Sequence, residues 1–80
     1  PNPFNPETKI KFRVPQNSGE NLTLSVFDIN GRLVKKLADG IFSPGEYEAV
    51  FDGRNFSSGV FFYRLEAGNF TASGKMTMIK

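Results

Sequence analysis

Apolar and charged side chains alternate along several short stretches of the sequence, and this period of two constrains the fold more than any other feature. In residues 8–14 the apolar positions are Ile10, Phe12 and Val14, and the positions between them are Lys9, Lys11 and Arg13. Such alternation is typical of a β-strand with one face buried and the other in water. It recurs in residues 21–28 and 45–51, at Leu22, Leu24 and Val26 and then at Tyr47, Ala49 and Phe51. The chain is therefore predicted to be all-β.

The remaining apolar stretches complete a set of six strands, and residues 41–42 are a candidate for a seventh. Residues 60–65 are apolar at both alternating sets of positions, which predicts a central strand covered on both sides, with residues 70–79 as its hairpin partner. Residues 32–38 are interpreted as a strand because they closely follow a turn signal. Six or seven short strands predict an antiparallel β-sandwich. We expect its core to contain Phe12, Leu24, Val26, Phe51 and Phe62.

Two turn signals connect these strands. Residues 28–31 have Asp first and Gly fourth, the arrangement of a type I turn that ends in a left-handed glycine and a bulge. This register would set Asp28 opposite Arg32. Residues 66–68 predict the same bulged geometry, because Ala67 resists the positive φ that a two-residue turn would ask of it.

The composition excludes several classes of function. The 80 residues include no Cys and no His, which removes disulfides, the usual nucleophile and the commonest zinc ligands. We therefore expect no catalytic site, no bound metal and no cofactor. The net charge of +2 is spread along the chain, unlike the clustered basic face that binds nucleic acid. No apolar run approaches the roughly 20 residues of a membrane span.

Prolines near the start divide the chain into a stiff lead-in at residues 1–7 and a single domain at residues 8–80. The first residues do not have the pattern of a signal peptide, so we expect a segment of a longer protein.

Three further motifs favour structural over functional explanations. Asp28, Asn30 and Gly31 have the start of a calcium loop, but the remaining ligands are missing, which favours a plain turn. Triplets that match the glycosylation acceptor pattern begin at Asn21, Asn55 and Asn69. Such triplets arise by chance where Thr or Ser alternates with apolar residues, so we interpret them as ordinary strand and loop residues. A solvated face is favoured over a docking surface for the basic strip of Lys9, Lys11 and Arg13.

Four segments carry a family resemblance: PNPFNPET at residues 1–8 followed by Ile10 and Phe12, VFDINGRLV at 26–34, SGVFFYRL at 58–65, and KMTMIK at 75–80. In order and spacing they resemble the type A C-terminal sorting domain of the type IX secretion system, also called the Por secretion system. The chain also stops at Lys80, where such domains are expected to end.

The resemblance implies an immunoglobulin-like sandwich that acts as a non-catalytic secretion signal. Such a domain follows an upstream cargo domain that has reached the periplasm, docks on the outer-membrane type IX translocon, and is commonly removed by a sortase-like peptidase. The expected destination is the surface of a Gram-negative bacterium or the medium. We expect a monomer with no nucleic-acid partner and no insertion into the membrane.

The resemblance also indicates which residues a receptor would contact. It marks Gly31 and Arg32, and Arg32 stands at the shoulder of a hairpin where its guanidinium is able to make bidentate contacts. Pairing of Arg32 with Asp28 across the hairpin is an equally good explanation. Residues 75–80 are the other predicted recognition segment, with strand pairing as a compatible second role. Its recognition residues are Lys75, Met76, Met78 and Lys80.

Two other classes of function stay open. One is a generic immunoglobulin-like binding or adhesion module. It includes the similar domain of flagellar hook-cap proteins, which also carries Asn-Pro-Phe and Gly-Arg features but would be expected to continue beyond the sandwich. A carbohydrate-binding module is suggested by the aromatic residues, yet there is no Trp and most Phe lie at core positions.

Overall fold

The computed structural model describes residues 7–16 and 19–79, and all of their regular structure is β-strand. The six strands are β1 (Glu7–Val14), β2 (Asn21–Phe27), β3 (Leu33–Ile41), β4 (Gly45–Asp52), β5 (Gly59–Ala67) and β6 (Phe70–Met78). β1 begins at Glu7, the last residue of the predicted lead-in, and the rest of that segment lies outside the described residues. No helix long and apolar enough to cross a membrane is found in the described part of the chain.

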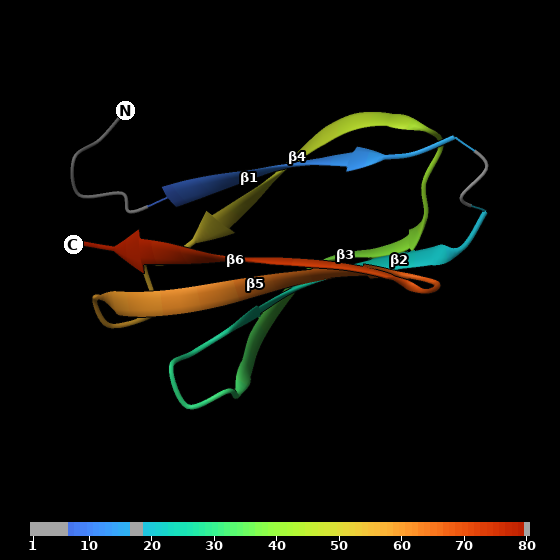
Figure 1. Cartoon of the computed structure of the whole chain (residues 1–80). Helices are drawn as coiled ribbons and strands as arrows, with labels where there is room; N and C mark the ends of the chain where they lie inside the picture. Colours follow the sequence, from blue (N-terminus) through green and yellow to red (C-terminus); the bar gives the residue numbers. More distant parts are fainter. Residues whose placement is uncertain (1–6, 17–18, 80) are drawn as a thin grey trace.

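The strands form two antiparallel sheets that face each other (Figure 1). β1 and β4 make a two-stranded sheet, and the other sheet has four strands in the order β3-β2-β5-β6. Between the layers, β1 approaches β6 and β4 approaches β3. This arrangement confirms the prediction of an all-β, immunoglobulin-like antiparallel sandwich.

The core lies between the layers, where the alternating apolar side chains of the two sheets meet. Its buried members are Ile10, Val14, Leu22, Leu24, Val26, Phe51, Phe61, Leu65, Met76 and Met78. Two groups of rings pack at opposite ends of the β1–β4 pair: Phe12 with Phe42 and Tyr47, and Phe51 with Phe56 and Phe61. Because each large ring removes about 150–250 Å² from water, these rings supply much of the burial that a domain without disulfides needs.

The predicted core is confirmed at Leu24, Val26 and Phe51, whereas Phe12 is half-buried against it. The prediction was wrong for Phe62, which is 39% exposed while its neighbour Phe61 is only 6% exposed. β5 is central in its sheet, as predicted, but it is covered on one face rather than two. A two-layer sandwich gives each strand a single buried face, so consecutive residues must point to opposite sides.

The segment after the first turn forms β3. It runs from Leu33 to Ile41, so the candidate seventh strand at residues 41–42 is partly the end of β3, and Phe42 belongs to the connection to β4. Its register against β2 shifts twice, which leaves Val34 and Leu37 without a direct partner.

The two predicted hairpin turns have different outcomes. Asp28 lies opposite Arg32, as predicted, and the backbone N–H of Asp28 donates to the Arg32 carbonyl at 2.9 Å. The prediction of a bulged turn at residues 66–68 was wrong, because Ala67 pairs directly with Phe70 and the loop between them consists of Gly68 and Asn69. Gly68 takes the positive φ of +58°. Ala67 therefore stays in extended strand conformation, and the glycine after it takes the positive φ that Ala67 would resist.

Candidate recognition surfaces

The loop of the β2–β3 hairpin is held by Asp28 and Gly31. Oδ1 of Asp28 accepts hydrogen bonds from the backbone N–H groups of Asn30 and Arg32, each at 2.9 Å. Gly31 has a φ of +82°, a conformation that side chains with a Cβ disfavour, and its N–H donates to the Asp28 carbonyl. The Arg32 side chain is 77% exposed, and its Nε lies 3.5 Å from Oδ2 of Asp28. The backbone is thus fixed while the guanidinium stays largely open to solvent.

The outer face of the four-stranded sheet, which is turned away from β1 and β4, carries aromatic and basic residues close to this loop. Phe27 of β2 pairs directly with Phe62 of β5, and Phe62 pairs with Lys75 of β6. The Arg64 guanidinium lies 4.7 Å from the centre of the Phe27 ring, within the range of a cation–π contact. We call Phe27, Phe62, Arg64 and Lys75 the outer cluster.

An open concavity continues from the outer cluster to the β2–β3 hairpin loop. The loop contributes Asp28, Ile29 and Gly31 to its lining. Ile29 is exposed, and so is Leu33, which pairs with Phe27 at the start of β3. The fold therefore brings two predicted recognition residues, Gly31 and Lys75, from distant parts of the sequence onto one surface that combines apolar area with charged groups. Of its cations, Arg64 forms an ion pair with Glu66 at 3.2 Å.

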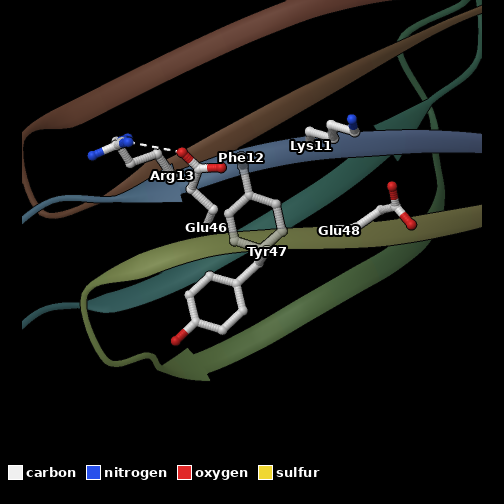
Figure 2. A pocket seen from close by; sticks show the side chains of 6 residues that line it. All are labelled: Lys11, Phe12, Arg13, Glu46, Tyr47 and Glu48. Atoms are coloured by element: carbon white, nitrogen blue, oxygen red, sulfur yellow. Dashed lines mark hydrogen bonds and ion pairs between the residues drawn. The ribbon is translucent and has the colours of Figure 1, made fainter.

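The outer face of the β1–β4 sheet differs because its charges are balanced across the strands. Lys11 pairs with Glu48 and Arg13 with Glu46. Figure 2 shows Arg13 and Glu46 pointing toward one another. The Nη2 atom of Arg13 lies 2.7 Å from Oε2 of Glu46. Both side chains of this ion pair are about three-quarters exposed. The acidic residues of β4 thus support the interpretation of the basic strip as a solvated face.

Two exposed carboxyl groups have shifted pKa values, and both shifts come from local partners. The pKa of Asp39 is lowered, first by the hydrogen bond from the Asn21 side chain and then by the charge of Lys36. The pKa of Asp52 is lowered by hydrogen bonds from the side chain and backbone of Arg54. Neither carboxyl group lines the concavity beside the outer cluster. Within residues 7–16 and 19–79, no three or more Asp and Glu residues gather in a way that could hold a metal ion.

A comparison with protein-family models matches residues 1–80 to the family described as the secretion system C-terminal sorting domain. The chain belongs to this family. It is the family of type IX sorting domains, so the resemblance carried by the four sequence segments is confirmed. The corresponding comparisons with curated proteins and with solved structures give no significant match.

The predicted recognition residues of this sorting domain fall into two groups. Gly31 and Lys75 line the concavity, and Arg32 projects from the same hairpin loop. Met76 and Met78 are 8% and 3% exposed and point into the core, so a receptor that contacts them must first displace them. Lys80 lies outside the described residues. A recognition role for these six residues stays a prediction.

Sequence reasoning missed Phe27, Phe62 and Arg64 of the sorting domain's outer cluster. Alternation along β2 contained the signal for Phe27, because Leu22, Leu24 and Val26 define the inner face and place Phe27 on the other. The proximity of Phe27 to Phe62 depends on the pairing of β2 with β5, strands far apart in the sequence, and no local pattern encodes that pairing.

Proposed function

We propose that this sorting domain directs an attached cargo protein across the outer membrane through the type IX machinery and catalyses no reaction itself. The family match over the whole chain carries the proposal, because members of the family act as C-terminal type IX sorting signals. The domain is in this sense a substrate of the export machinery. Its partners are the outer-membrane translocon, a sortase-like peptidase and the cargo, and its destination is the cell surface or the medium.

The physical properties of the domain support a signal that is read as a folded surface. The β2–β3 hairpin loop is held by four hydrogen bonds that involve Asp28, so it presents Arg32 from a fixed backbone. A preformed surface loses little conformational freedom on binding. The outer cluster beside the loop contains two Phe and Arg64, and aromatic residues and Arg are enriched at protein interfaces.

The proposal is tested by fusing residues 1–80 to the C-terminus of a reporter that is targeted to the periplasm. We expect the reporter at the surface or in the medium of a host with type IX machinery, and in the periplasm of the same host after the translocon is deleted. The measurement is the reporter activity in each fraction. Retention of the reporter in the periplasm of the host with intact machinery would contradict the proposal.

Arg32→Ala probes the hairpin loop within this assay. The exposed pair with Asp28 is worth about 0–1 kcal/mol, so the melting temperature should hardly change, whereas export should fall if a receptor binds the guanidinium. Lys9→Ala is the matched control, since it removes an exposed cation from the opposite sheet. Deleting residues 75–80 is a poor probe, because it also removes Met76 and Met78 from the core.

A further inference from the structure

The four-stranded sheet has two edges, β3 and β6, and they differ in how well they are protected. β3 carries Lys35, Lys36 and Asp39, and its two register shifts interrupt the ladder with β2. Bulges and charged side chains are devices that prevent an edge strand from pairing with another chain. The β3 edge is therefore a poor template for a further strand.

β6 has fewer of these devices, since its ladder contains no register shift and it carries a single charged residue. It pairs with β5 in an unbroken register from Met78 opposite Gly59 to Phe70 opposite Ala67. Its nine residues include one charged side chain, that of Lys75. Among the strands of residues 7–16 and 19–79, β6 has a hydrogen-bonded neighbour on one side only. A long, regular edge of this kind is a ready template for strand addition.

The hairpin register identifies the backbone groups that are free at this edge. Because Gly68 and Asn69 form a two-residue loop, the closing residues Ala67 and Phe70 exchange hydrogen bonds. Counting from Phe70, every second residue of β6 then forms backbone hydrogen bonds with β5. The residues between them direct their N–H and C=O groups away from β5. Those outward residues are Thr71, Ser73, Lys75 and Thr77.

The same residues place their side chains on the outer face of the sheet, because Met76 and Met78 occupy the inner face. Lys75 stands among Ser and Thr, and none of the ion pairs within residues 7–16 and 19–79 involves it. Its cross-strand neighbour on β5 is Phe62, which is partly exposed. A strand added to β6 would therefore place one of its side chains beside the Lys75 ammonium group, which has no carboxylate partner among the described residues.

We propose that β6 binds an extended segment of a partner protein as an additional strand, and that this segment places an acidic side chain beside Lys75. The inference rests on the proposed function, since it assigns the partner to the export machinery. Opposite charges across a strand pair are favourable and like charges are not. A second copy of β6 is a less suitable occupant, because its outer face offers another Lys75 and no carboxylate.

Ser73→Pro tests the strand addition in the reporter fusion. Proline removes the outward N–H of Ser73 and leaves the hydrogen bonds between β5 and β6 in place, which edge strands tolerate. We expect export to fall about tenfold or more, while the melting temperature changes by a few degrees. Ser73→Thr is the matched control, since it keeps the N–H group and should be exported like the unaltered fusion.

Lys75→Glu tests the charge, and it decides the question if Ser73→Pro lowers the thermal stability too far. It should reduce export about tenfold or more, whereas Lys9→Glu, which makes the same charge change on the opposite sheet, should leave export unchanged. Lys9 lies opposite Val50 and is also exposed.

The outcomes separate this inference from the function on which it rests. Normal export of folded Ser73→Pro or of Lys75→Glu would overturn strand addition while leaving the sorting role intact. An unaltered fusion retained in the periplasm would contradict the sorting role, and the inference with it. Sedimentation that shows a dimer of the unaltered chain, lost in Ser73→Pro, would identify a second copy as the occupant and overturn the partner strand.

Discussion

At the scale of single residues, the neighbouring side chains of Phe61 and Phe62 on β5 lie on opposite faces of the sheet. Phe61 is buried, and its ring lies 5.4 Å from that of Phe51 and 6.1 Å from that of Phe56, measured between centroids. Phe62 points the other way, toward Phe27 and Lys75 on the outer face. One residue thus stabilises the core, and the next shapes the surface that we assign to recognition.

The two phenylalanines should respond differently to truncation. Phe61→Ala leaves a cavity among packed rings and should reduce the free energy of unfolding by about 3–5 kcal/mol. Phe62→Ala removes a partly solvated ring and should cost about 1 kcal/mol or less. Urea unfolding of both variants measures the difference. Equal losses would mean that Phe62 is packed as tightly as Phe61.

At the scale of secondary-structure elements, the β2–β3 hairpin depends on one carboxylate. Asp28 accepts hydrogen bonds from two backbone N–H groups and lies within ion-pair distance of Arg32. A side chain that binds its own loop in this way replaces the water that these N–H groups would otherwise need. The loop conformation is therefore determined mainly by Asp28 and Gly31.

Asp28→Ala should lower the free energy of unfolding by about 1–3 kcal/mol, because it leaves the N–H groups of Asn30 and Arg32 without their acceptor. Arg32→Ala should cost about 0–1 kcal/mol, since it removes only an exposed ion pair. Thermal unfolding compares the two variants. A larger loss in Arg32→Ala than in Asp28→Ala would show that the ion pair rather than the hydrogen bonds holds the loop.

Features of the fold could be predicted from the sequence where neighbouring residues determine them, and could not where they depend on contacts between distant strands. The hairpin at residues 28–32 could be predicted, because Asp and Gly at fixed positions determine the backbone. The buried face of β5 could not, since Phe61 and Phe62 satisfy the period of two in either register. The compensation of Arg13 by Glu46 required knowledge that β1 pairs with β4, a contact between residues far apart in sequence. The outer cluster depends on strand pairing in the same way.

At the scale of the whole molecule, stability depends on two layers without disulfides, and the chain contains no His to titrate near neutrality. The pKa values of Asp39 and Asp52 in the folded state lie below the ordinary value of 3.8. A carboxyl group with a lowered folded pKa stabilises the fold above its unfolded pKa. That contribution disappears as the pH falls through the folded pKa.

We therefore expect the free energy of unfolding to change little between about pH 5 and 8 and to decline below about pH 4. In a variant with both Asp39→Asn and Asp52→Asn, the decline should be shallower, because two of the groups responsible no longer titrate. Urea unfolding across this pH range gives the two curves. Identical slopes would show that these carboxylates do not contribute to acid sensitivity.

The pairing of distant strands also determines which parts of the chain must be present before the domain can fold. β1 has no partner until β4 exists, and β2 cannot complete its sheet before β5. β6 then contributes Met76 and Met78 to the core. A copy interrupted before β5 would leave Leu24, Val26 and Phe51 exposed to proteases and chaperones. Formation of the core therefore requires β5 and β6 in addition to the strands that precede them.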